Sequence, residues 1–117
     1  MAQPVLFEIL SAVGIITINR PERHNAINDE TGALLSECIQ KAIHNSDVRA
    51  ILLRGAGKSF CSGRDTSVLG HRVDGESDYH FVRRHQQTRM AILDCPKPVI
   101  ASVKGAAIGG GCEMALV

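Results

Sequence analysis

The stretch KPVIASVKGAAIGGGCEMA, residues 97–115, carries more structural information than any other part of this chain. An apolar, β-branched run over residues 99–103 leads into three consecutive glycines, followed by a predicted helix that begins near Gly110 and carries Glu113. Glycine lets a ligand approach the backbone closely, and the first N–H groups of a helix have no partner within that helix. The stretch therefore predicts a strand, a turn and a helix start that can bind an oxyanion beside a carboxylate.

The first half of the chain has the alternating strand and helix patterns of an α/β protein. Two β-branched runs, residues 5–10 and 14–19, predict a hairpin with a break between them at residues 11–13. Apolar residues at helical spacing predict an amphipathic helix that begins at Asn28 or Asp29 and ends near Asn45. The apolar run within residues 48–54 predicts a strand that is covered on both faces.

The middle of the chain predicts a loop and a second helix. No period persists between residues 55 and 75, so we expect a long irregular segment with a short helix over residues 66–69. A helix is predicted over residues 77–93, ended by the prolines at 96 and 98. Its predicted apolar stripe consists of Tyr79, Val82, Gln86, Met90 and Leu93. The strand and helix order predicts parallel strands joined by right-handed crossovers.

Composition narrows the class of function. The chain has 117 residues, 44% of them hydrophobic, which is enough for the core of one domain. A net charge of +1 and 3% aromatic residues offer no binding surface for a nucleic acid or an anionic membrane, so neither is expected as a partner. No zinc or disulfide spacing occurs among the cysteines and histidines, so no metal is expected. The start of the chain resembles no secretion signal, which favours the cytoplasm.

Structural roles are expected for the histidines, for three arginines and for two of the cysteines. We expect the five histidines to lie at the surface. Arg83, Arg84 and Arg89 are expected to form a solvated helix face, and Cys61 and Cys112 are expected to be small buried packing residues.

Three blocks of the chain, residues 19–28, 53–65 and 96–115, together resemble the crotonase (enoyl-CoA hydratase/isomerase) family. The blocks occur in the family's order, and the match spans essentially the whole chain. The resemblance implies a crotonase-like spiral of strand-strand-helix units, truncated after the second crossover. Residues 1–117 would form the N-terminal part of a single domain, without the C-terminal part that includes the trimerisation helices. It also implies an acyl-CoA substrate, no permanently bound cofactor, and a homotrimer or hexamer for the full-length protein.

The resemblance also assigns the residues of an active site. Family members stabilise the enolate of a thioester with two backbone N–H groups, which fall on Arg64 and Gly110. Glu113 matches a glutamate that acts on the added water in family hydratases, whose second glutamate lies about twenty residues further along, beyond Val117. Arg64 stands where a small residue is more usual. We expect its side chain to bind a CoA phosphate or to narrow the acyl pocket, and we favour the phosphate.

Loop residues on either side of these positions are implied to contact CoA or the thioester. They are Arg23, Ala26, Ser62, Gly63, Asp65, Thr66 and Ser67. Arg23 would place a charge near a phosphate, and Ala26 would offer backbone contacts. Asp65 is expected to accept backbone N–H bonds that hold its loop, and not to act as a base.

Several functions remain open on the sequence. The favoured one is addition of water to a trans-2-enoyl-CoA to give a 3-hydroxyacyl-CoA. The alternatives are an enoyl-CoA isomerase that uses one carboxylate, and an inactive fragment or binding scaffold. A truncated chain is also expected to expose apolar surface and to be poorly soluble. The run GAGKS, residues 55–59, resembles a phosphate-binding loop, but the full pattern requires glycine at Leu52 and a helix after Ser59.

Overall fold

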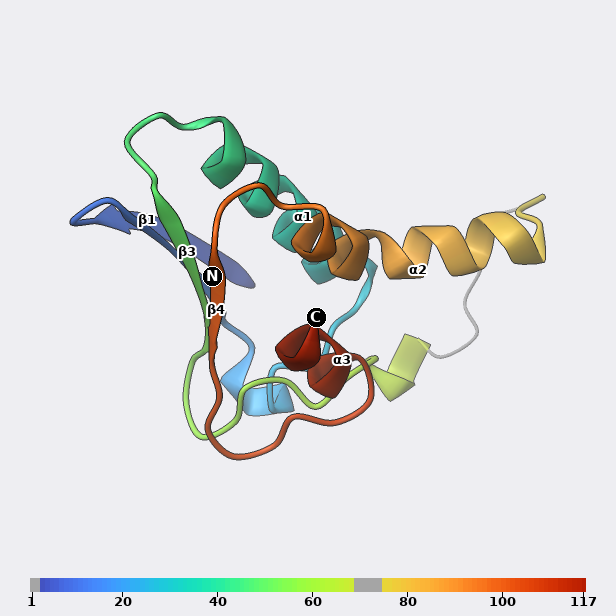
Figure 1. Cartoon of the computed structure of the whole chain (residues 1–117). Coiled ribbons are helices and arrows are strands. Elements are labelled where there is room, and N and C mark those ends of the chain that lie inside the picture. The colour runs from blue at the N-terminus through green and yellow to red at the C-terminus, as the bar shows by residue number, and fades with distance from the viewer. Residues whose placement is uncertain (1–2, 69–74) are drawn as a thin grey trace.

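The computed structural model describes residues 3–68 and 75–117, which form a four-stranded sheet with helices packed against it (Figure 1). Strands β1 (Val5–Leu10) and β2 (Val13–Ile18) are antiparallel. Strands β3 (Ala50–Gly55) and β4 (Val99–Ser102) then add in parallel, so the sheet order is β1-β2-β3-β4. The predicted α/β architecture with two parallel connections is confirmed.

The hairpin turn between β1 and β2 consists of Ser11 and Ala12. Both residues are left-handed, with φ of 51° and 67°, as in the primed turns that match the twist of a two-residue hairpin. Val13 already pairs with Leu10, so the break is shorter than the sequence predicts.

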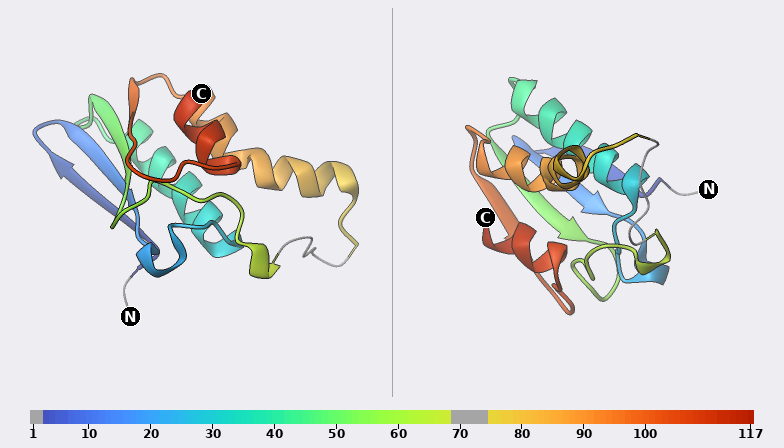
Figure 2. Two further views of the ribbon diagram at one scale, coloured as in Figure 1. Left: turned by 90° about the horizontal axis from the view of Figure 1, so that it is seen from below. Right: turned by 90° about the vertical axis from the view of Figure 1, so that its right-hand side faces the viewer.

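Helix α1 (Asp29–His44) connects β2 to β3, and helix α2 (Asp78–Leu93) connects β3 to β4 (Figure 2). Asn28 caps α1, because its side chain accepts a hydrogen bond from the backbone N–H of Thr31 at 2.9 Å. Ser77 caps α2 through the N–H of His80 at 3.2 Å. Both helices therefore begin where the sequence predicts.

Three shorter helices lie in the segments that follow β2, β3 and β4. They are the 3-10 helices η1 (Pro21–Arg23) and η2 (Thr66–Val68) and the α-helix α3 (Gly110–Leu116). The last residue of the predicted short helix, Leu69, lies outside the described residues. Within residues 3–68 and 75–117, no helix combines the length and the apolar character that a membrane span requires.

The core lies on one face of the sheet. The strand register places Phe7, Ile16, Leu53 and Ala101 in one row across the four strands, and all four belong to the core or pack against it. Helices α1, α2 and α3 lie on this side (Figure 1). Leu52 points to the opposite face, as alternation along a strand requires, and is only half-buried. The prediction that this strand is covered on both faces is therefore wrong here.

Helix α2 turns a different face inward from the one predicted. Most of the predicted stripe is exposed, namely Tyr79, Val82, Met90 and Leu93. The inward positions are Phe81, His85, Thr88 and Ile92, which also have helical spacing. Thr88 is buried because its hydroxyl lies 3.1 Å from that of Ser36 and bonds the Gly32 carbonyl at 3.2 Å, both on α1. Apolar periodicity does not predict this inward face, because two of its four residues are polar and Thr88 is buried through hydrogen bonds.

Candidate active site

The loops that follow β3 and β4 are joined by backbone hydrogen bonds. Cys61 and Ala107 form a parallel β-bridge. The N–H groups of Phe60 and Cys61 both donate to the carbonyl of Ala106, at 3.1 and 3.0 Å. The N–H of Ile108 donates in return to the carbonyl of Cys61 at 3.0 Å. The two loops are therefore held at a fixed separation by main-chain atoms.

A second bridge ties the loop after β3 to the start of α1. The N–H of Ile27 donates to the carbonyl of Gly63, and the N–H of Asp65 donates to the carbonyl of Ile27, each at 2.8 Å. Arg64 lies between these two bonds, so its own N–H is not used by the bridge.

Two glycines permit the close approach of these loops. Gly63 has a φ of 96°, and a Cβ there would lie 2.7 Å from the carbonyl oxygen of Ile108 and 3.5 Å from the backbone nitrogen of Gly110. A Cβ on Gly111 would overlap the backbone of Cys61. Side chains at either position would push α3 away from the loop that carries Arg64.

Asn25 is the buried centre of the neighbouring loop. Its side-chain amide donates to the carbonyls of Ala56 at 2.8 Å and Ser59 at 2.7 Å, and its oxygen accepts the backbone N–H of Arg20 at 2.8 Å. Asn25 therefore connects the chain after β2 to the chain after β3. No sequence signal gave Asn25 a role, although it stands beside the positions assigned to CoA.

Asp65 anchors the same region from the other side. Its carboxylate accepts the hydroxyl of Ser67 at 2.7 Å and the backbone N–H of Ser67 at 3.0 Å, and it forms an ion pair with Arg20 at 3.0 Å. These hydrogen bonds, those from Ser67 first, lower the pKa of Asp65 to about 2. Asp65 is thus an ionised group that holds its loop, in the way expected from the sequence.

A cavity of about 480 Å³ opens between these loops and α2. Its lining brings together four of the residues assigned from the sequence: Gly63, Arg64, Gly110 and Glu113. Across the hydrogen bonds of residues 3–68 and 75–117, neither the N–H of Arg64 nor that of Gly110 has an acceptor. Two free backbone donors and a carboxylate therefore border one cavity.

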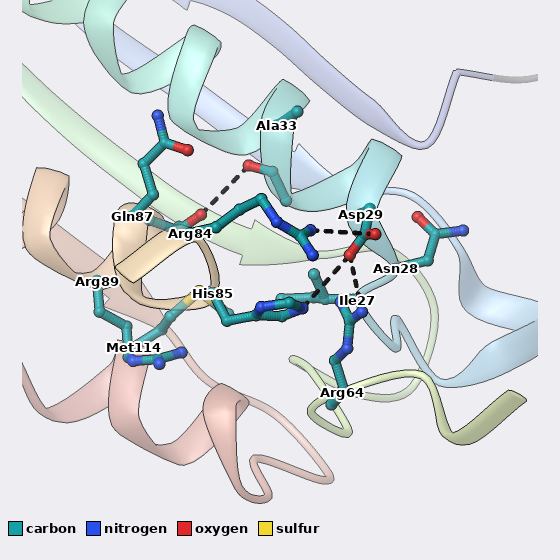
Figure 3. Close-up of a pocket in the computed structure, with 12 residues that line it drawn as sticks. Ile27, Asn28, Asp29, Ala33, Arg64, Arg84, His85, Gln87, Arg89 and Met114 are labelled. Carbon is teal, nitrogen blue, oxygen red and sulfur yellow. Dashed lines mark hydrogen bonds and ion pairs between the residues drawn. The ribbon is translucent and has the colours of Figure 1, made fainter. Parts of the chain in front are cut away.

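An adjoining cavity of about 350 Å³ lies between α1 and α2 (Figure 3). Asp29 is its charged centre, since its carboxylate contacts Arg64 at 2.7 Å, Arg84 at 3.1 Å and the His85 ring at 3.5 Å. Burial alone would raise the pKa of Asp29, but the hydrogen bonds and charges of Arg64 and Arg84 outweigh it and lower the pKa below its usual value. The two cavities share four wall residues: Ile27, Arg64, His85 and Arg89.

The side chain of Arg64 lines the cavities and is paired with a carboxylate. Its guanidinium is turned toward Asp29, at the start of α1. Contact of this side chain with a CoA phosphate and narrowing of the acyl pocket both stay predictions.

Three residues of α2 correct the sequence expectations. Arg84 and Arg89 are not on a solvated face, since Arg84 pairs with Asp29 and Glu76, and Arg89 pairs with Glu113 at 3.0 Å. His85 is a wall residue and not a surface group, and its Nδ1 lies 2.7 Å from the Phe81 carbonyl. For His85 and Arg89, the available signal was the i, i+4 spacing from Phe81, which places these three residues on one helix face.

The other predicted contact residues lie outside the cavity lined by the two donors. They are Arg23, Ala26, Ser62, Asp65, Thr66 and Ser67. Arg23 is exposed, whereas the N–H of Ala26 donates to the Arg23 carbonyl and its own carbonyl accepts from Arg20. The backbone of Ala26 is thus already engaged within its loop.

The remaining sequence expectations have mixed outcomes. Cys61 is buried, which raises the pKa of its thiol, but Cys112 is exposed and does not pack in the core. Residues 55–59 lead into the bridge at Cys61 and not into a helix, so the phosphate-loop alternative is not supported. In the described part of the chain, no group of three or more His, Cys, Asp or Glu side chains could hold a metal ion.

Two unused backbone donors beside a carboxylate on a short helix agree with the family that the sequence itself matches. The chain belongs to the enoyl-CoA hydratase/isomerase family, whose match covers residues 8–117. It is 43% identical over 99% of its length to a probable enoyl-CoA hydratase of Mycobacterium tuberculosis. It is 34% identical over 99% of its length to the 1,2-epoxyphenylacetyl-CoA isomerase of Escherichia coli.

Solved structures agree with this assignment. An enoyl-CoA hydratase/isomerase from Xanthobacter autotrophicus superposes with a TM-score of 0.87 at 36% identity over 99% of this chain. An enoyl-CoA hydratase from Mycobacterium smegmatis gives 0.86 at 31% identity over 97%. The predicted crotonase-like fold is thus confirmed. The chain spans 46% and 45% of the two relatives and 44% of each solved chain.

Proposed function

We propose that the protein that carries this chain is an enoyl-CoA hydratase, which adds water to a trans-2-enoyl-CoA to give a 3-hydroxyacyl-CoA. The observation that carries the proposal is the cavity lined by Arg64, Gly110 and Glu113, with both backbone N–H groups unused by the described residues. The family membership supports acyl-CoA chemistry at this place.

In the proposed mechanism, the thioester oxygen accepts hydrogen bonds from the N–H groups of Arg64 and Gly110. Negative charge develops on that oxygen when water attacks C3, and a fixed donor at such a site is worth roughly 3 kcal/mol. The bridges at Cys61 and Ile27 support this role, because they fix both donors before the substrate binds. The donors then need no rearrangement during the reaction.

Glu113 accepts a proton from the water whose oxygen bonds to C3. The enolate then takes a proton at C2 from an acid, so that the elements of water are added across the double bond. Hydration thus requires a group that takes a proton and a group that gives one. Glu113 is half-exposed, at the rim of the cavity, where a water molecule can reach it.

The proposal extends to the CoA portion and to the whole protein. The CoA would extend from the cavity to the surface along five loop residues, namely Arg23, Ala26, Ser62, Thr66 and Ser67. The full-length protein would be a homotrimer or hexamer in the cytoplasm, without a resident cofactor. The family resemblance supports the CoA contacts, the oligomeric state and the lack of a resident cofactor.

An enoyl-CoA isomerase is the second candidate. Within the described residues, Glu113 is the carboxylate that lines the cavity with the free donors, and one carboxylate can move a proton from one carbon to another. A dienoyl-CoA isomerase of Rattus norvegicus is 40% identical over 85% of this chain, which spans 33% of that relative.

Glu113→Gln in the full-length protein tests the proposal. We expect kcat for hydration of trans-2-enoyl-CoA to fall by about 10²–10⁴, with KM changed by less than about two-fold, because the amide cannot accept the proton. Glu37→Gln, on the exposed side of α1, is the matched control and should keep full activity. Hydration by Glu113→Gln at the normal rate would contradict the proposal. Double-bond migration without hydration in the unmodified protein would establish the isomerase.

A further inference from the structure

We propose that Arg89 is a positioning residue that holds the Glu113 carboxylate in place for proton transfer. This inference rests on the proposed function, because it gives Arg89 a role only through Glu113. It adds to the site a residue on α2 that the resemblance does not assign.

The contacts place Arg89 beside the carboxylate and beside the residue that carries one of the free donors. Its Nε lies 3.0 Å from Oε2 of Glu113. Its Nη1 would be 3.6 Å from a Cβ on Gly110, so the guanidinium also packs over that residue. Both Arg89 and Glu113 line the 480 Å³ cavity.

The two partners differ in burial, and this determines which one orients the other. The Arg89 side chain is 24% exposed, whereas that of Glu113 is 59% exposed. A glutamate side chain with this much exposure samples several rotamers in solvent. The more buried Arg89 restricts it to an orientation over the cavity, and a well-oriented group lowers the barrier of a proton transfer.

The ion pair leaves part of Glu113 available. Arg89 contacts Oε2, and Oε1 has no hydrogen-bond partner within residues 3–68 and 75–117. Oε1 is then the oxygen that accepts the proton from water. Arg64 and Arg84 also line a cavity wall, but both are paired with Asp29, so Arg89 is the arginine that serves Glu113.

The pair contributes little as a stabilising contact. Ion pairs with a half-exposed partner contribute little to folding free energy, since solvent screens them. Loss of Arg89 should therefore appear in turnover and not in the melting temperature.

Arg89→Met in the full-length protein, assayed with trans-2-enoyl-CoA, is the first test. We expect kcat to fall about ten-fold with KM within about two-fold, because Glu113 is present but no longer held. Arg89→Lys should recover part of kcat, since it keeps the charge without the planar group. Arg83→Met, which removes the same charge from an exposed position of α2, should have normal activity.

A double variant separates this inference from the proposed function. If Arg89 acts through Glu113, Arg89→Met should cause no further loss in a Glu113→Gln background. An equal ten-fold loss in both backgrounds, or an unchanged kcat in folded Arg89→Met, would overturn the role of Arg89. If Arg89→Met does not fold, Arg89→Gln decides, since it removes the charge with a polar side chain, and an unchanged kcat in that variant overturns the proposal. Normal hydration by Glu113→Gln alone would instead overturn the proposed function.

Discussion

The two sides of the 480 Å³ cavity are held in different ways. On the loop side, Gly63, Arg64 and Gly110 are fixed by backbone bridges and by the hydrogen bonds of Asn25 and Asp65. On the helix side, α2 has two buried residues, Thr88 and Ile92, and the ion pair of Arg84 with Asp29 also joins it to α1.

This difference separates the part that carries the proposed chemistry from the part that shapes the space around it. Backbone hydrogen bonds between buried groups cannot be exchanged for water without a cost, so the donors stay in place. The ion pair of Arg84 with Asp29 lies near the surface, where such pairs contribute little and can rearrange. We therefore expect this side to adapt to the acyl group of the proposed substrate while the donors do not move.

The largest effect is expected where the two loops meet, at Gly111. Gly111→Ala should lower the free energy of unfolding by roughly 3 kcal/mol, because the new methyl group overlaps the backbone of Cys61. Activity should fall by more than about a hundred-fold, since α3 carries a donor away from its partner loop. Thermal denaturation and initial rates measure both effects.

Gly110→Ala is the control for stability. Its Cβ would meet Arg89 at 3.6 Å, an ordinary contact, so the free energy of unfolding should change by less than about 1 kcal/mol. Equal destabilisation by the two variants would show that the Cys61 contact does not fix the loops.

A smaller effect, with a defined pH dependence, is expected at Asp65. The pKa of Asp65 is about 2 in the folded protein, against an ordinary value of 3.8, so its carboxylate stabilises the fold above pH 3.8. This stabilisation is lost as the pH falls through 3.8 toward 2. Asp65→Asn should therefore have a lower melting temperature at neutral pH, and the difference from the unmodified protein should shrink over that interval.

Asp47→Asn, at an exposed position between α1 and β3, is the matched control and should melt like the unmodified protein. A melting-temperature difference for Asp65→Asn that stays constant down to pH 2 would rule out the carboxylate as its source.

The smallest effect is expected on the helix side, at Arg84. Its hydrogen bond to Glu76 and the charge of Asp29 raise the pKa of Arg84, which remains a cation. Arg84→Met should lower the free energy of unfolding by about 1 kcal/mol at low salt and by less at high salt. Hydrogen exchange should accelerate in α2 but not in residues 59–65.

Arg83→Met serves as the comparison, because it removes a cation from the exposed face of the same helix. Equal acceleration of exchange in α2 and in residues 59–65 would mean that the two sides of the cavity are not independent.

Much of the fold follows from local sequence signals. Asn28 and Ser77 mark the starts of α1 and α2, and the β-branched runs give all four strands within two residues at either end. The inward face of α2 does not follow, because Thr88 is buried through hydrogen bonds to α1. Those bonds depend on residues more than fifty positions away.

In the site, too, sequence motifs located some residues, whereas contacts between distant elements could not be predicted. The glycine-rich turn and the family resemblance located Gly63, Arg64, Gly110 and Glu113, and the structure places all four on one cavity. The pairing of Arg64 with Asp29 and of Arg89 with Glu113 could not be predicted, because each pair joins elements that meet only in the folded chain. Their roles in catalysis remain predictions.

The bridges at Cys61 and Ile27 have a consequence for how this chain can change over evolutionary time. Main-chain hydrogen bonds do not depend on side-chain identity, so substitutions at Arg64, His85 or Arg89 would leave the bridges in place. Single substitutions on α2 could then change which acyl group the proposed site accepts, or the path of the proton. Such tolerance agrees with the occurrence of both a hydratase and an isomerase among the relatives of this chain.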